Sequence, residues 1–237
     1  MGHHHKVTTT ESVAITNDKE THLSVYVLLP TDLKLSVDHG EAIVRKYLTD
    51  HGAASELYDG TNPGPHDDVT PMDVLALNAL NAFVGTAPME PMSALWGKRT
   101  AIQNKLAQVR LSHSDVTGLT DDEVRSETDK VSQVLTLIEH TPGWGPTRAA
   151  KLLHRLRPGS VPIWDELVGE WYGGWLQPWT DYLQAVFSDV RRETTRDALL
   201  AIQGRCCPHL TALRIWDIIL WKLKYDSYRS PKPARGV

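Results

Sequence analysis

The sequence has little of what would cross-link a fold or bind a metal cluster. Cysteine occurs only twice among 237 residues, as the neighbours Cys206 and Cys207. Because adjacent cysteines rarely form a favourable disulfide, we expect reduced thiols and a cytoplasmic location. Two thiols are also too few for a four-cysteine iron–sulfur cluster. We therefore expect a fold held by its hydrophobic core, which a chain of this length can bury.

Long apolar runs and short catalytic motifs are missing as well. No apolar run approaches the ~20 residues that cross a membrane. The first six residues, MGHHHK, lack the apolar stretch of a secretory signal, and their histidines are either native or part of a tag. We find no Walker loop, dinucleotide fingerprint or nucleophile elbow. The other histidines are scattered, so we expect no metal. The missing nucleotide-binding motifs and the missing long apolar runs predict no cofactor and no membrane partner.

Charge is divided unevenly between the two parts of the chain. Residues 1–142 carry 11 basic and 20 acidic side chains, a net charge of −9, whereas residues 143–237 carry 14 and 9, a net charge of +5. One interpretation is a basic face for a polyanion. The other is an acidic solvated half beside a mildly basic one, which charge alone favours.

Helical patterns account for most of the chain. The repeat of apolar residues at i, i+3, i+4 and i+7 predicts a mainly α, compact multi-helix domain with about eight helices and a short strand within residues 22–29. We expect this single domain to span residues 22–228, between a flexible segment at 1–21 and a flexible tail at 229–237. Residues 58–68 contain several turn signals and predict a long loop. The expected helices lie near 38–51, 70–84, 91–111, 120–142, 146–156, 165–172, 179–192, 195–205 and 209–225.

The most informative segment is residues 139–156, EHTPGWGPTRAAKLLHRL. One helix is expected to enter, the turn Gly143-Trp144-Gly145 follows, and a second helix leaves. The glycines permit a tight turn and a close approach to another molecule, and the start of the second helix suits a phosphate. The alternative is an ordinary αα-hairpin. We expect a solvent-facing basic stripe on the second helix, formed by Arg148, Lys151 and Arg155.

Asp165 follows this hairpin at a spacing of twenty residues from Gly145, after the short extended piece Val161–Trp164. An aspartate before a helix is most often an N-cap, which needs no enzyme to explain it. The order of hairpin, packed helix, extended stretch and aspartate nevertheless resembles the helix-hairpin-helix DNA glycosylases. This resemblance covers residues 130–175.

In that superfamily the hairpin binds a DNA phosphate, and the aspartate assists departure of a flipped base. The resemblance thus implies DNA as partner and Asp165 as the catalytic residue of a monofunctional base-excising N-glycosylase. Members that also cut the strand carry a lysine just after the glycines, where this chain has Pro146-Thr147-Arg148. Since guanidinium stays protonated and Lys151 lies a turn further on, no strand-cutting lyase step is expected. The implied DNA contacts are Gly143, Trp144, Gly145, Thr147, Arg148 and Lys151.

Aromatic side chains crowd the same region, because seven of the eight tryptophans lie between residues 144 and 221. Such side chains build the stacking surfaces of base pockets, but tryptophan is also an ordinary core residue. We assign Trp216 and Trp221 to the core. The candidates for a base pocket are Trp164, which stands where the superfamily more often has an aliphatic residue, and Trp171 and Tyr172.

A second resemblance spans most of residues 40–225. The segments Tyr58-Asp59-Gly60, Val161–Asp165 and Leu213-Arg214-Ile215-Trp216-Asp217 are similar to an uncharacterised bacterial domain family, which implies no activity. Two other hypotheses therefore stand beside the glycosylase. One is a non-catalytic DNA-binding or protein-interaction module on the same helical fold, and the other is a scaffold that binds no nucleic acid. An open cleft at Asp165 would favour the enzyme, and a filled one the module.

Overall fold

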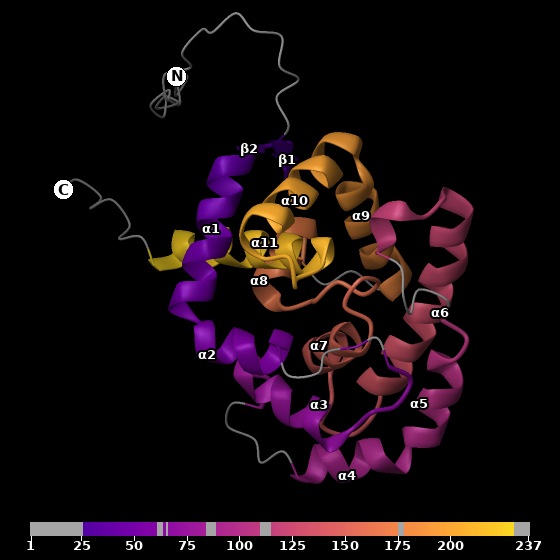
Figure 1. Ribbon diagram of the computed structural model, residues 1–237. Coiled ribbons are helices and arrows are strands. Elements are labelled where there is room, and N and C mark those ends of the chain that lie inside the picture. Colours follow the sequence, from indigo (N-terminus) through magenta and orange to yellow (C-terminus); the bar gives the residue numbers. More distant parts are fainter. Residues whose placement is uncertain are drawn as a thin grey trace, which may run out of the picture.

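The computed structural model describes residues 26–60, 64, 66–83, 89–109, 115–174 and 178–229. Within these ranges the chain is mainly helical with one two-stranded sheet, which confirms the predicted fold class (Figure 1). The segment 1–21 lies outside the described residues, and so does the expected tail except for Arg229, which ends the last helix. That residues 22–228 form a single domain stays a prediction.

The described elements, in chain order, are two strands followed by helices of several kinds. Of the non-α helices, η1 is a π-helix and η2, η4 and η5 are 3-10 helices. The elements are β1 (Tyr26–Leu28), β2 (Lys34–Ser36), α1 (Val37–Asp50), α2 (Gly52–Ser55), η1 (Glu56–Gly60), α3 (Pro71–Ala76), η2 (Leu77–Leu80), α4 (Met89–Gly97), α5 (Arg99–Leu106), η4 (Val116–Gly118), α6 (Asp121–Glu139), α7 (Pro146–Leu156), α8 (Glu166–Gly169), η5 (Glu170–Tyr172), α9 (Trp179–Arg191), α10 (Glu193–Cys206) and α11 (Ala212–Arg229).

Several boundaries differ from the sequence-based expectation. The strand expected in 22–29 is β1, but it pairs antiparallel with β2, which the pattern did not predict. The helix expected over 91–111 is interrupted at Lys98, whose ψ of 1° is not helical. The first three residues of the loop expected over 58–68 belong to the π-helix η1 instead.

Helix α11 lies at the centre of the fold. It packs against α1, α8, α9 and α10, and its first nine residues are all buried. A helix that is apolar almost all round is expected in such a position. Figure 1 shows α11 crossing α1, with α10 above it and α8 below it. The polar residues of its first turns are therefore largely enclosed by protein and form ion pairs there.

The hairpin between α6 and α7 has the predicted boundaries. Gly143 and Gly145 both have positive φ, +80° and +42°, in backbone regions that L-residues with a side chain rarely adopt. Pro146 then occupies the first helical position of α7, where its missing N–H costs no hydrogen bond. A Cβ on Gly143 would lie 2.8 Å from Cγ of Pro91 on α4, so this glycine also allows α4 to pack against the turn.

No helix in the described part of the chain is long and apolar enough to cross a membrane.

The two hairpin glycines give a graded stability prediction. Replacement of Gly145 by Ala should lower the free energy of unfolding by ~1–3 kcal/mol, the cost of a backbone conformation with φ of 42° and ψ of 173° that only glycine adopts readily. Gly143→Ala should cost more, because the added Cβ also contacts Pro91. Urea unfolding measures both. The control is Gly204→Ala inside α10. A Cβ added there would meet no neighbouring group within 4 Å, and the higher helix propensity of alanine should raise stability by ~0.5–1 kcal/mol. Equal costs for all three variants would contradict this account.

Candidate functional site

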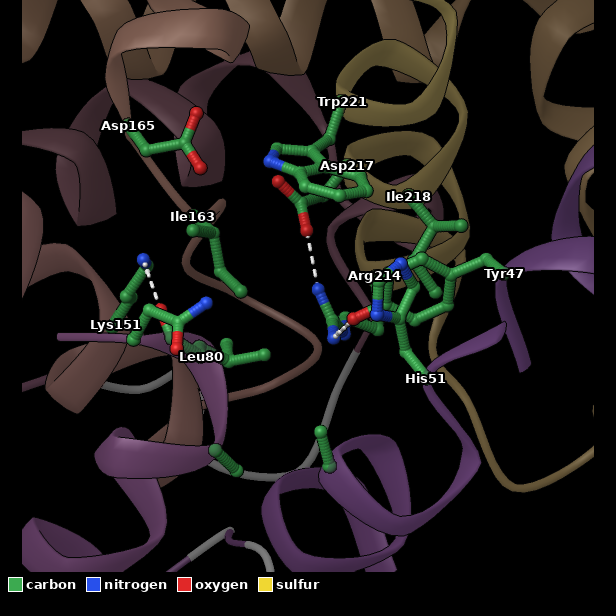
Figure 2. Close-up of a pocket in the computed structure, with 13 residues that line it drawn as sticks. Tyr47, His51, Leu80, Lys151, Ile163, Asp165, Arg214, Asp217, Ile218 and Trp221 are labelled. Carbon is green, nitrogen blue, oxygen red and sulfur yellow. Dashed lines mark hydrogen bonds and ion pairs between the residues drawn. The ribbon is translucent and has the colours of Figure 1, made fainter. Parts of the chain in front are cut away.

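Asp165 lines a pocket of about 230 Å³ between the two parts of the chain (Figure 2). One wall comes from α1, α2 and η2, and the other from α7, the start of α8 and α11. Four charged side chains line it, and aromatic and aliphatic groups complete it. Its principal lining residues are Tyr47, His51, Lys151, Asp165, Arg214, Asp217 and Trp221.

Asp165 combines a structural role with a place in this pocket. It is the N-cap of α8, and its Oδ1 accepts a hydrogen bond of 3.0 Å from the amide of Val168. This confirms the capping interpretation. Figure 2 shows the carboxylate directed into the pocket, toward Asp217. Because the cap uses one oxygen, the other is available on the pocket side.

Asp217 is the second carboxylate of the pocket and comes from the buried part of α11. Its Oδ2 accepts a hydrogen bond of 2.5 Å from Nη1 of Arg214. Burial raises the pKa of Asp217 to about 7; Arg214 opposes this rise, and the charge of Asp165 adds to it. Asp217 therefore exchanges its proton near neutral pH.

Arg214 is the cation that orders this wall of the pocket. Its Nε donates to Oδ1 of Asp59 at 2.9 Å, and its Nη2 donates to the hydroxyl of Tyr47 at 2.9 Å. Asp59 in turn accepts a hydrogen bond of 2.8 Å from the hydroxyl of Ser55. With Asp217 included, one buried guanidinium joins α1, η1 and α11. Such a planar, fork-shaped group suits several acceptors at once.

Lys151 does not lie on the solvent face, so this part of the expected basic stripe is wrong. Its side chain is 7% exposed and lines the pocket, and its Nζ donates to the carbonyl of Leu80 at 2.9 Å. Burial lowers the pKa of Lys151, against the opposing effect of Asp165 and Asp217. Lys151 lies one helical turn beyond the position at which the strand-cutting members of the superfamily carry their lysine. In the structure its amine shares the pocket with Asp165.

Of the rest of the expected stripe, Arg155 is buried and Arg148 is partly exposed in the groove at the hairpin. Arg155 is 1% exposed, and its Nε donates to Oδ1 of Asp73 at 2.9 Å. Arg148 is half-buried at the hairpin, where it donates to the carbonyls of Ala82 and Gly143. Helical spacing identified a polar face of α7 correctly, but that face packs against η1, α3 and η2, where partners compensate its charges.

The expected aromatic sites are only partly supported. Trp144 is buried, with its Nε1 donating to the carbonyl of Pro91 at 2.7 Å, so it does not project from the hairpin. Trp171 and Tyr172 do not line the Asp165 pocket. Both are turned toward α11 instead. Trp171 donates to the carbonyl of Leu220, and the hydroxyl of Tyr172 accepts from Nε1 of Trp216. As pocket candidates these two are wrong.

Trp221 stands in the place where we expected Trp171 and Tyr172. It is half-buried rather than part of the core, and it lines the Asp165 pocket. It also lines a shallow groove beside Asp165, together with Trp164, Pro146 and Thr147. Trp216 is buried, as predicted. The sequence reasoning thus missed Trp221, Arg214 and Asp217, and its single hint was that Leu213–Asp217 is one of the segments shared with the uncharacterised family.

The shallow groove connects the pocket with the hairpin. Pro146 and Thr147 line it on one side and also line a second groove, of about 370 Å³, at the Gly143–Gly145 turn. Asp165 therefore opens toward the start of α7. The hairpin groove also contains Glu139, whose Oε2 accepts a hydrogen bond from Nε1 of Trp179. Across the part of the chain that the structure describes, no group of His, Cys, Asp or Glu could hold a metal ion.

The burial of Arg155 yields a prediction opposite to that for a surface arginine. Arg155→Met should lower the free energy of unfolding by ~3–5 kcal/mol, since it leaves the carboxylate of Asp73 buried without its arginine partner. Denaturant unfolding measures it. The control is Arg125→Met on α6, whose exposed pair with Asp122 should be worth less than ~1 kcal/mol. A loss as small as that of the control would mean that Arg155 does not hold α7 to α3.

Comparison with known proteins gives a family but no activity. No curated protein and no solved structure matches the chain. A family model described as "Family of unknown function (DUF6308)" matches residues 41–224, which include every pocket residue named above and the hairpin. The chain therefore belongs to this family of unknown function.

Proposed function

We propose that this chain binds DNA through the hairpin and releases a base from it by monofunctional hydrolysis of the N-glycosidic bond at Asp165. The single observation that supports this most is the position of Asp165, which faces a pocket whose rim continues to the first turn of α7. A carboxylate in such a place can stabilise the positive charge that develops on the sugar as the base leaves. It can also orient the attacking water.

The start of α7 is the proposed contact with the DNA backbone. Its N-cap is Gly145, which offers no side-chain acceptor to the first amides of the helix. Those amides and the helix dipole favour an anion, and the groove at the turn gives access to it. A phosphate bound there would place the neighbouring nucleotide over the shallow groove. From this groove an extruded base could reach the pocket beside Trp221.

The alternative remains a non-catalytic DNA-binding or protein-interaction module. It predicts a filled site, whereas the carboxylates, the amine and the guanidinium line an open space here. A volume of about 230 Å³ is below the ~300–1,000 Å³ common for drug-sized ligands, so the pocket suits a small planar group rather than a large one. We therefore favour the enzyme.

Asp165→Asn separates catalysis from capping. Asparagine caps a helix about as well as aspartate, so the melting temperature should stay nearly unchanged, whereas Asp165→Ala should cost ~1 kcal/mol. Base release from a panel of damaged oligonucleotides should fall by orders of magnitude in Asp165→Asn, because the charge is lost. Release is measured by cleavage at the resulting abasic sites in alkali.

The matched control is Asp115→Asn, which makes the same change at another N-cap that does not line the pocket. It should retain parental activity, whereas its stability should fall slightly, because the second oxygen of Asp115 accepts a hydrogen bond of 3.3 Å from the amide of Ala212, which the NH2 group of asparagine cannot accept. If Asp165→Asn releases base as fast as the parent, or the parent releases none, the catalytic role is wrong and Asp165 is a cap alone.

Thr147→Glu tests the hairpin as the DNA-binding element. Glutamate in the first turn of α7 should leave the fold intact, since a negative charge suits a helix N-terminus, but should repel a phosphate there. We expect duplex DNA to bind more weakly, with the slope of log affinity against log salt reduced by ~0.9 for each phosphate that the variant no longer binds. Fluorescence anisotropy at several salt concentrations measures both.

Thr194→Glu is the matched control, because Thr194 occupies the same second position of an exposed helix start in α10. Equal DNA affinity of the two variants would show that α7 does not bind the DNA. No binding by the parent even at low salt would favour a scaffold that does not bind nucleic acid.

A further inference from the structure

We propose that Asp217 is a second catalytic residue of this pocket, the general acid that protonates the departing base while Asp165 stabilises the sugar. This inference rests on the function proposed above and narrows its substrate class. It assigns the site to neutral purine bases, which leave a sugar readily when a free ring nitrogen accepts a proton.

The two carboxylates enter the same pocket from different elements. Asp165 caps α8, and Asp217 lies one turn inside α11. Each of the hydrogen bonds described above uses one oxygen, Oδ1 of Asp165 and Oδ2 of Asp217. In Figure 2 the other oxygen of Asp217 points away from Arg214, to the side of the pocket where Asp165 lies, with the indole of Trp221 beside it. A base in the pocket would therefore meet both carboxyl groups.

Their surroundings divide the two roles. Asp165 is half-buried at the mouth of the shallow groove, whereas Asp217 is 4% exposed. The charged groups that face Asp217 are Arg214 on its own helix, Lys151 on α7 and Asp165. Two titratable groups of other elements also lie close, Tyr182 of α9 and His51 after α1. Behind Arg214, Asp59 and Tyr47 take up much of the guanidinium charge.

This environment supports a protonated Asp217. Burial raises its pKa to about 7, so a large fraction of the molecules carries the proton at neutral pH. Since Oδ2 accepts from Arg214, the proton belongs on the pocket-side oxygen. Many hydrolases pair a carboxyl group of raised pKa, which acts as the acid, with a second carboxyl group in the same site.

The reaction balances with water as the only co-reactant. The bond between C1′ and the base nitrogen breaks, its electron pair goes to the base, and the proton of Asp217 goes to a ring nitrogen. The carboxylate of Asp165 stabilises the resulting oxocarbenium ion. Water adds its oxygen to C1′, and the proton that it releases returns to Asp217 through solvent. The products are an abasic sugar and a neutral base.

The experiment compares two kinds of leaving group in the full chain. The probes are oligonucleotides with hypoxanthine or adenine, which are neutral purines, and one with N7-methylguanine, which already carries a positive charge. We expect Asp217→Asn to slow release of the neutral bases by ~10²–10⁴-fold, the usual contribution of a general acid. Release of N7-methylguanine should change less than about tenfold, since it needs no proton. Asp226→Asn, further along α11 and paired with Lys222, is the control and should change neither.

A pH profile of the parent gives a second measurement that does not depend on the variant's folding. Release of a neutral base should fall above pH about 7, because Asp217 loses its proton there, and this fall should be absent for N7-methylguanine and in Asp217→Asn. If the parent releases only neutral bases, this pH profile alone tests whether Asp217 is the general acid.

Three results would overturn the inference while leaving Asp165 as the catalytic residue. They are equal losses on both leaving groups in Asp217→Asn, a parent that releases only N7-methylguanine, and no alkaline fall above neutral pH for neutral bases. A parent that releases no base from any probe would overturn the proposed function and this inference with it.

Discussion

The buried guanidinium of Arg214 is the group on which the pocket depends. It binds Asp59, Asp217 and the hydroxyl of Tyr47, and so fixes η1 and α1 against the central helix α11. Removing it would leave two carboxylates in the core, which is more costly than losing a surface pair. The same contacts keep Asp217 partly ionisable despite full burial. Stability of the fold and chemistry of the site therefore share one cation.

Helix α7 repeats this arrangement on the opposite wall. Arg155 binds Asp73 and the carbonyl of Tyr58, and the hydroxyl of Tyr58 donates to the carbonyl of Lys151 at 2.6 Å. His154 is held between them, and burial lowers its pKa to about 4, so it is neutral in the folded protein. Lys151 is the one cation of these on α7 that lines the pocket. The polar face of α7 thus connects the hairpin with the N-terminal helices instead of facing water.

Asp165 shows how a capping residue can serve a site. The cap fixes the carboxylate at the end of the extended piece before α8, with one oxygen held by the amide of Val168. The other oxygen gains a fixed direction at no further cost, which is what a catalytic carboxylate requires. Asparagine can keep the cap through its amide oxygen but has no negative charge, so the two roles of Asp165 depend on different properties of the same side chain.

Local physics was enough to predict the helical class, the turn at Gly143–Gly145, the bounds of the helix after it and the cap at Asp165. Periodicity, proline and glycine positions and capping preferences all act within a few residues, so they can be read from the sequence. Whether a polar helical face meets water or other polar groups depends on distant segments, as in the pair of Arg214 with Asp59, 155 residues away. The same holds for Trp221, which lines the pocket although its spacing is that of a core residue. Only the tertiary structure brought Asp165, Lys151 and Asp217 into one pocket, because no short-range rule relates positions on three helices that meet through the core.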